Sequence, residues 1–341
     1  MNQTDITALI AMIKADGGIA IKSVDDSAKN NFDLVLEAVQ HNGVALYYVS
    51  PELQANPQIA KAAILNNPLA WSFVAKTLLE DEQFINEMLT LSQQTLYYAD
   101  KKFSENRDIV ERAIAYDPTT LQYASDKLRN NRELVMRAVN KDKYCVEFAC
   151  TNLKSDRDFM LPLIKEHPHL LQFASNDLRK NRKFIFEVLT HQGRALQFVD
   201  ASLKDDIELV LVAIKNHRWA FEYASKNLHS NRNLIIQALE YSGQVMKSID
   251  EELRNDKELV SLAINKHYWT FEYASTRLKA DAGFILSHIT NKPDILRYVD
   301  AQLLTDLTFA IQAVTLNPRS YNYLADNLKA NETIKLLLNR K

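Results

Sequence analysis

Apolar residues recur along this chain at helical spacing, in short stretches that each follow a polar residue. Leu134, Val135, Ala138 and Val139 form one such stretch, and equivalent sets stand at the same place in other copies. Spacings of three and four residues place side chains on one side of a helix. Each stretch therefore predicts an amphipathic helix with one stripe against a core, which we call the first helix.

The pattern repeats every 25 residues without insertion. A leucine in the phrase Tyr-Ala-Ser-x-x-Leu, such as Leu128, marks the register, and Asn or Asp stands three residues after it. The thirteen residues of this column are Asn31, Asn56, Asp81, Asn106, Asn131, Asp156, Asn181, Asp206, Asn231, Asp256, Asp281, Asp306 and Asn331. A short polar side chain here accepts a hydrogen bond from a free N–H of the first helical turn. The column therefore predicts the starts of the first helices.

A second apolar stripe follows in each copy, after a helix breaker. The breakers are Gly43, Gly193, Gly243, Pro68, Pro118, Pro168, Pro293 and Pro318. Leu121, Ala124 and Leu128 illustrate the second stripe, which predicts a second helix. Ser or Asp three residues before the marker, such as Ser125, either caps a final short turn or breaks this helix. A continuous helix and a helix with a 3₁₀ turn both fit the pattern.

Two helices of about ten residues cannot bury their stripes alone, so the units must stack on one another. The sequence predicts an all-α fold, an α-solenoid of about thirteen 25-residue two-helix repeats. Residues 1–22 are expected to form a capping half-repeat, residues 23–330 the repeats and residues 331–341 a C-terminal capping helix. Segments 217–225 and 267–275 are nearly identical and indicate a 50-residue double unit.

Composition and charge exclude several classes of function. The 41 Lys and Arg residues against 43 Asp and Glu residues give a formal charge of −2, which argues against general nucleic-acid binding. With only 6 glycines and no glycine-rich loop, a nucleotide-binding α/β enzyme is not expected. The sequence contains no catalytic signature and no metal-ligand motif, so we predict a protein without enzymatic activity, cofactor or metal.

Features of cellular location agree with a cytoplasmic protein. Cys145 and Cys150 offer no disulfide framework, which fits a reducing compartment. No apolar run approaches the roughly 18 residues of a membrane helix, and the N-terminus lacks a basic region followed by an apolar one. We expect no membrane span and no Sec-type signal peptide.

Three sets of residues are candidates for binding. An aromatic residue recurs five positions before the marker leucine, and Trp219 and Trp269 each lie four residues before such a tyrosine. Arg107, Arg132, Arg157, Arg182 and Arg232 follow the capping column. The aromatic residues fit either packing between repeats or stacking on a partner. The arginines fit either salt bridges to neighbouring units or recognition of phosphate or acidic groups.

Charge is distributed unevenly along the chain. Residues 1–100 contain 5 basic and 12 acidic residues, a net charge of −7, whereas the other 241 residues carry a net charge of +5. The arginine column and the two tryptophans coincide with the shift to positive charge. Residues 107–275 are therefore the predicted binding region for a protein or peptide.

The repeat resembles a family of uncharacterised helical repeats, domain of unknown function 4116. Residues 121–139, Leu-Gln-Tyr-Ala-Ser-Asp-Lys-Leu-Arg-Asn-Asn-Arg-Glu-Leu-Val-Met-Arg-Ala-Val, carry the resemblance, which covers most of the chain. The resemblance implies a bacterial protein with no assigned catalytic residues. It also implies a relationship to effectors that intracellular pathogens deliver into host cells. The resemblance also implies a further non-repeat domain, which we do not expect in this sequence, so an effector role would depend on binding.

The interpretation that we prefer is a non-catalytic interaction scaffold that binds a protein or peptide on its surface. The first alternative is a protein that binds single-stranded RNA, with aromatic residues as stacking platforms. The second is an enzyme whose site is assembled across repeats. An effector would act in the cytosol of a host cell, and any other role in the cytoplasm.

Overall fold

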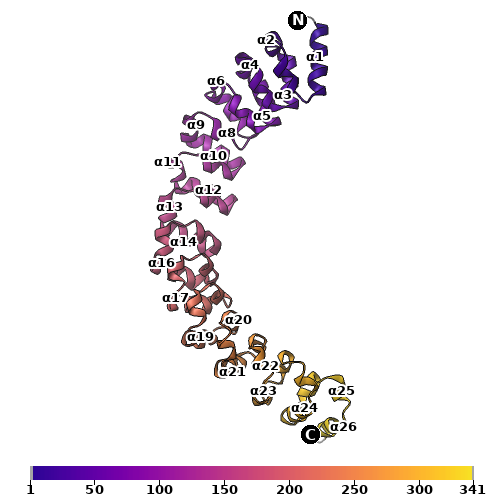
Figure 1. Cartoon of the computed structure of the whole chain (residues 1–341). Helices are drawn as coiled ribbons and strands as arrows, with labels where there is room; N and C mark the ends of the chain where they lie inside the picture. The colour runs from indigo at the N-terminus through magenta and orange to yellow at the C-terminus, as the bar shows by residue number, and fades with distance from the viewer. Residues whose placement is uncertain (1–2, 340–341) are drawn as a thin grey trace. The chain divides into compact units, whose positions relative to one another are not determined.

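The structure, a computed structural model, describes residues 3–339 (Figure 1). Over this range its regular secondary structure is helical and contains no strand, which confirms the predicted all-α repeat architecture. The chain divides into two compact parts, Met1–Phe159 and Met160–Lys341, and the division falls inside α14 (Arg157–Glu166). We call them the N-terminal and C-terminal parts. Residues 1–2 and 340–341 of the predicted caps lie outside the described range.

The first helix of each repeat is an α-helix of seven to ten residues, and a longer one of thirteen residues precedes them. These helices are α1 (Gln3–Ala15), α3 (Phe32–His41), α5 (Pro57–Asn66), α7 (Glu82–Met88), α10 (Arg107–Tyr116), α12 (Arg132–Lys141), α14, α16 (Arg182–His191), α17 (Ile207–Asn216), α19 (Arg232–Leu239), α21 (Lys257–Lys266), α23 (Ala282–Ile289), α24 (Leu307–Leu316) and α26 (Glu332–Asn339). We call these first helices, together with α1, the long helices.

The polar column caps the long helices as predicted. The side-chain oxygen of each of the thirteen Asn or Asp residues accepts a hydrogen bond from a backbone N–H two or three residues ahead. For Asn131 the donor is the N–H of Leu134, at 3.0 Å. Because the capping residue is extended and the next residue is helical, the column sets where each long helix begins.

We expect Asn131→Ala to lower the free energy of unfolding by about 1 kcal/mol, because the N–H of Leu134 would lose its acceptor. Urea unfolding followed by circular dichroism measures the change. The neighbouring Asn130→Ala serves as control, because Asn130 ends α11 (Asp126–Arg129) and its side chain caps no helix. Equal stability of the two variants would contradict the assigned helix start.

The predicted second helix is two shorter helices. A 3₁₀ helix comes first and a helix of three to five residues second, separated by residues such as Ala124 in extended conformation. The 3₁₀ helices are η1 (Ile19–Ser23), η2 (Gly43–Tyr48), η3 (Pro68–Phe73), η4 (Pro118–Tyr123), η5 (Lys143–Phe148), η6 (Pro168–Phe173), η7 (Gly193–Phe198), η9 (Ala220–Tyr223), η11 (Tyr268–Tyr273), η12 (Pro293–Tyr298) and η14 (Pro318–Tyr323). The one-turn α-helices α8 (Thr95–Tyr98) and α20 (Val245–Ser248) occupy the same place in two repeats. Ser125 therefore marks a break in the predicted helix.

The second of the two shorter helices carries the marker residue, which is a leucine in every copy except those with Ala28 and Phe103. These helices are α2 (Asp26–Lys29), α4 (Pro51–Gln54), α6 (Lys76–Leu79), α9 (Lys101–Glu105), α11, α13 (Thr151–Ser155), α15 (Asn176–Lys180), η8 (Ala201–Leu203), α18 (Lys226–His229), η10 (Leu253–Asn255), α22 (Thr276–Lys279), η13 (Leu303–Thr305) and α25 (Asp326–Lys329). In the N-terminal part, Figure 1 shows α2, α4, α6 and α9 along one side and α1, α3 and α5 along the other.

Repeats within each part stack through their cores and their backbones. Apolar residues of the long helices, such as Leu134 and Val135, are fully buried, and successive long helices such as α3 and α5 contact each other. The N–H that opens one short helix donates to a carbonyl of the preceding repeat, as from Ser125 to Ser104 at 2.9 Å and from Ser275 to Arg254 at 2.9 Å. These bonds join neighbouring repeats in a fixed register.

Two of the glycine breakers allow a second connection between repeats. The Gly43 N–H donates to Oδ1 of Asn66 at 2.6 Å, and Nδ2 of Asn66 donates to the carbonyl of Gln40 at 2.8 Å. Asn216 bridges Gly193 and Thr190 in the same way, at 2.7 and 3.1 Å. Proline has no N–H to donate, so Gly and Pro are not equivalent here. Glycine in this place allows the next repeat to approach closely.

Candidate interaction surface

The 3₁₀ helices carry the predicted series of aromatic residues. The residue five positions before each marker leucine, which we call the ring position, is half-buried wherever it is aromatic: Tyr48, Phe73, Tyr98, Tyr123, Phe148, Phe173, Phe198, Tyr223, Tyr273, Tyr298 and Tyr323. Successive 3₁₀ helices within each part contact one another, as η2 with η3 and η11 with η12. Within each part we call these side chains, with Trp219 and Trp269 included in the C-terminal part, the aromatic face of that part. It combines packing between repeats with exposed ring surface.

A second residue extends the aromatic face from one repeat to the next. The residue immediately before the ring position, which we call the cover position, contacts the ring of the following repeat in four cases. Tyr47 lies against Phe73, with ring centroids 5.2 Å apart, and Tyr97 lies against Tyr123 at 5.6 Å. Both cover tyrosines are largely exposed, at 59% and 65%. Sequence reasoning missed them, although two Tyr-Tyr pairs 50 residues apart were a visible signal.

In the other two cases the cover residue is a cation. Nζ of Lys22 lies 5.9 Å from the ring centroid of Tyr48, and the guanidinium carbon of Arg297 lies 5.7 Å from that of Tyr323. A cation within about 6 Å of a ring centroid is attracted by the negative face of the ring. Two rings of the aromatic face therefore form cation–π contacts with side chains of the chain itself.

Trp219 and Trp269 are both half-buried, each between a long helix and the ring position. Nζ of Lys247 lies 5.3 Å from the centroid of Trp219. Trp269 stacks on His267 at 5.5 Å and meets Tyr273 edge-on at 6.4 Å. The exposed part of each indole is available to a partner, and binding by these residues stays a prediction.

The structure places the arginine column between repeats. Arg182 pairs with Asp206 at 2.7 Å and with Glu208, and Arg232 pairs with Asp256 at 2.8 Å and with Glu258. Each acidic partner belongs to the following repeat. These contacts fit the interpretation of the column as salt bridges to neighbouring units.

The remaining arginines of the column also pair with acidic residues. Arg107 binds Glu111 and Glu133, each at 2.7 Å, and Arg132 lies 3.6 Å from Asp156. Arg157 lies 3.1 Å from Asp158 on its own helix. Recognition of a partner by these guanidinium groups stays a prediction.

The arginines and the tryptophans lie at opposite ends of the long helices. Arg232 is the first residue of α19, whereas Trp219 and Trp269 come after α17 and α21 have ended. A ten-residue helix is about 15 Å long, so the two groups are not one patch. The structure brings the tryptophans together with the ring positions and not with the arginine column.

Acid should weaken the salt bridges of the arginine column. Partial burial acts to raise the pKa of Asp206, but hydrogen bonds from Arg182 and from the N–H groups of Leu209 and Glu208 outweigh it and lower the pKa. Asp256 is lowered in the same way by Arg232. A carboxyl with a lowered pKa in the folded state stabilises the fold above its unfolded pKa of about 4. This contribution is lost as the pH falls through the folded pKa.

We therefore expect Arg182→Gln with Arg232→Gln to melt at a lower temperature than the unchanged protein at pH 7. The difference should shrink below about pH 4, because acid protonates the carboxyl partners in the unchanged protein as well. Thermal unfolding across pH measures it. A difference that is constant down to pH 2 would contradict this role of the ion pairs.

Another set of basic side chains, just after the marker leucine, has a structural role that the sequence did not reveal. Nζ of Lys204 donates to the carbonyl of Gln197 at 2.8 Å, and Nζ of Lys279 to that of Glu272 at 2.6 Å. Arg254 binds the carbonyls of Ile249 and Lys247. Each cation satisfies carbonyls at the end of a preceding 3₁₀ helix or one-turn helix.

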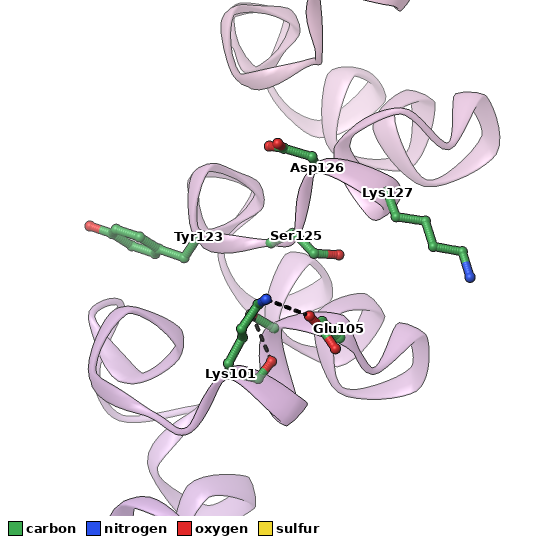
Figure 2. A pocket seen from close by; sticks show the side chains of 8 residues that line it. Lys101, Glu105, Tyr123, Ser125, Asp126 and Lys127 are labelled. Carbon is green, nitrogen blue, oxygen red and sulfur yellow. Dashed lines mark hydrogen bonds and ion pairs between the residues drawn. The ribbon is translucent and has the colours of Figure 1, made fainter.

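One cavity of the N-terminal part, about 670 Å³ in volume, lies beside α9, η4 and α11. Its lining includes Lys101, Glu105, Tyr123, Asp126 and Lys127. Figure 2 shows Lys101 directed to Glu105, its ion-pair partner at 3.2 Å, while Tyr123, Asp126 and Lys127 point away from one another. The ionisable groups do not converge on one point, so this cavity lacks the geometry of acid–base or nucleophilic catalysis.

Residues 3–339 contain neither a cluster of metal-ligating side chains nor a helix that could cross a membrane. No group of three or more His, Cys, Asp or Glu residues in this range could hold a metal ion. No helix in this range is long and apolar enough to cross a membrane. The two cysteines are free thiols, and burial raises the pKa of Cys145 to about 12.

Comparison with known proteins identifies a family of helical repeats. The model of the family described as domain of unknown function (DUF4116) matches residues 9–54, 106–154, 144–179, 156–200, 181–229 and 231–279, which together make up more than half of the chain. No curated protein and no solved structure matches.

Proposed function

We propose that this chain, which belongs to the DUF4116 family of helical repeats, is a non-catalytic scaffold that binds a protein or peptide partner along its aromatic face. The observation that carries the proposal is the recurrence of half-buried rings at one position of successive repeats, with Trp219 and Trp269 beside them. Tyr and Trp are enriched among residues that dominate binding energy, because they combine a large apolar area with a polar group.

The rings have the features of an adaptable contact surface. The buried side of each ring packs against the stacked repeats, so the ring loses little conformational entropy when a partner covers it. Exposed polar residues next to the rings in the sequence, such as Glu222 beside Tyr223, can form hydrogen bonds with a partner. An extended partner can contact several repeats in turn, as solenoid proteins permit.

The proposal excludes catalysis as the main function. Arg182 and Arg232 are paired with carboxylates of the following repeat. The side chains of Tyr123, Asp126 and Lys127 at the cavity point away from one another (Figure 2). A catalytic site needs ionisable groups within reach of one reacting atom. Binding through a broad surface makes no such demand.

An intracellular location is part of the proposal, in the cytoplasm or, for an effector, in the cytosol of a host cell. Cys145 and Cys150 support it, because both are free thiols and disulfides are rare in reducing compartments.

Site-specific photo-cross-linking tests the function. A photoreactive amino acid replaces Glu222, exposed on η9, or Asn265, exposed on α21. In bacterial and eukaryotic lysates we expect the probe at 222 to capture a protein and the probe at 265 to capture none. Trp219→Ala with Trp269→Ala should abolish the capture. Capture at 265 alone, or recovery of RNA in place of protein, would overturn the proposal.

A further inference from the structure

Among the described residues of the N-terminal part, three cover residues contact the ring of the following repeat, whereas Ser72 and Gln122, which precede Tyr98 and Phe148 by one repeat, do not. Lys22 lies over Tyr48, Tyr47 lies against Phe73, and Tyr97 lies against Tyr123. The cover residue that precedes Tyr98 by one repeat is Ser72, which is exposed. A serine side chain ends at its hydroxyl group and cannot extend over a neighbouring ring as a lysine or a tyrosine does.

Two neighbouring aromatic side chains hold the Tyr98 ring in place. Trp71, only 1% exposed, stacks parallel to Tyr98 with centroids 5.8 Å apart, and its indole N–H is fixed by Ser92 at 3.1 Å. Tyr97 stands perpendicular to Tyr98 at 4.8 Å. The buried indole supports one face of the half-buried Tyr98 ring. Ser72, the cover residue of the preceding repeat, does not extend over this ring.

Charge favours a cation as the missing cover. Residues 1–100 carry 12 acidic and 5 basic side chains, the most negative stretch of the chain, and they include Ser72 and Tyr98. The chain itself places a cation over an equivalent ring twice, with Lys22 at Tyr48 and Arg297 at Tyr323. A positive side chain on a partner would therefore meet a net negative stretch of the chain and a ring face that attracts cations.

We propose that the Tyr98 ring receives a Lys or Arg side chain of the protein partner, in the place that Lys22 takes at Tyr48. This inference rests on the proposed function and specifies its chemistry: the partner carries a basic side chain on the segment that crosses η3 and α8. Lys22 already lies over the Tyr48 ring, so in the unchanged chain the Tyr48 ring is covered while the Tyr98 ring is open.

Two substitutions of exposed residues change the number of open rings in opposite directions. Ser72→Lys supplies the missing cover from the chain itself, and Lys22→Ser opens the Tyr48 ring. Tyr48 and Tyr98 are two repeats apart, about 16–20 Å at the usual spacing of packed helices. An extended peptide covers this distance in about six residues. A peptide with two cations at that spacing can therefore reach both rings in the Lys22→Ser variant.

The experiment is an NMR titration of the full chain with three dodecapeptides of Gly and Ser. The first carries one central lysine, the second carries norleucine in its place, and the third carries two lysines six residues apart. The ring signals of Tyr98 and the indole N–H of Trp71 report occupancy of the site. Gln83→Lys, on the exposed side of α7, is the control variant because it adds the same charge away from Tyr98. Thermal unfolding verifies that each variant folds.

We expect the lysine peptide to bind at least about threefold more tightly than the norleucine peptide, and Ser72→Lys to remove that advantage while Gln83→Lys keeps it. In Lys22→Ser the second lysine should raise the affinity at least about threefold more than it does in the unchanged protein. Equal losses in Ser72→Lys and Gln83→Lys, or equal binding of lysine and norleucine, would overturn the inference.

The scaffold function and the cation site at Tyr98 can fail separately. If the probe at 222 captures a protein and the captured protein binds Ser72→Lys as well as the unchanged chain, the cation site is wrong and the scaffold function stands. If the probe captures no protein and the lysine peptide still binds at Tyr98, the scaffold function is wrong and the ring site stands.

Discussion

Gly193→Ala is expected to destabilise the C-terminal part by about 3 kcal/mol, at the upper end of the usual cost of overpacking. A β-carbon at this position would lie well inside van der Waals contact with the carbonyl oxygen of Ala213 and 2.9 Å from the backbone nitrogen of His217. Both atoms belong to the backbone of the next repeat, so no side chain can rotate away. The repeats would have to separate, which would also strain the bridge from Asn216 to the Gly193 N–H.

Denaturant unfolding followed by circular dichroism measures this effect, and Gly283→Ala is the matched control. A β-carbon at Gly283 would meet only Oδ1 of Asp281, at 3.6 Å, and the residue lies in the first turn of α23. Alanine there should leave the stability unchanged or raise it by up to about 1 kcal/mol, because glycine is the poorer helix former. If both variants had the same stability, the close approach of repeats at Gly193 would be wrong.

Trp219→Ala with Trp269→Ala is expected to weaken binding of the partner by about 2 kcal/mol or more. Each indole is half-buried and held by a neighbour, Trp219 by Lys247 over its ring and Trp269 by the stacked His267, so a partner would contact the ring surface that these neighbours leave exposed. Loss of a large, pre-positioned ring removes apolar contact area and a hydrogen-bond donor at once. Isothermal titration calorimetry with the captured partner measures the change.

Tyr116→Ala is the control for this prediction. Tyr116 is 58% exposed at the end of α10 and is outside the aromatic face, so its removal should leave the affinity unchanged. Circular dichroism verifies that the helix content of each variant is intact. An affinity that Tyr116→Ala lowers as much as the double tryptophan variant would contradict a specific role of the tryptophans.

The sequence predicted those parts of the fold that depend on local signals. An Asn or Asp such as Asn131 caps its helix through bonds to its own next residues, so its position alone identified where each long helix begins. The four apolar residues after it are buried because their spacing places them on one stripe. These two local signals were sufficient to predict the all-α repeat architecture that the structure confirms.

Other parts depend on contacts between repeats and could not be predicted. Leu121 and Ala124 suggested one helix, yet the segment is a 3₁₀ helix that ends before an extended Ser125, whose N–H binds the preceding repeat. Short segments commonly adopt 3₁₀ geometry, and the spacing of apolar residues over one or two turns does not distinguish it from an α-helix. Gly and Pro looked alike as breakers because only the structure shows the asparagine that binds the glycine N–H.

The candidate site was predicted in part. The ring positions and the tryptophans were identified from their spacing, whereas the cover positions were missed because each acts on the ring of the next repeat, 26 residues away. For the arginine column both interpretations were open. Its partners lie 24 and 26 residues ahead, as Asp206 and Glu208 do for Arg182, which is a spacing that the 25-residue repeat makes meaningful once stacking is known.

Hydrogen exchange in the complex of the full chain with its captured partner tests the central claim most directly. The account predicts slower exchange of backbone N–H groups in residues 219–223 and 268–273, on the aromatic face, with unchanged exchange in α19 and α21. Slower exchange confined to the long helices, with the 3₁₀ segments unchanged, would show that the partner binds elsewhere and would contradict the aromatic face as the binding surface.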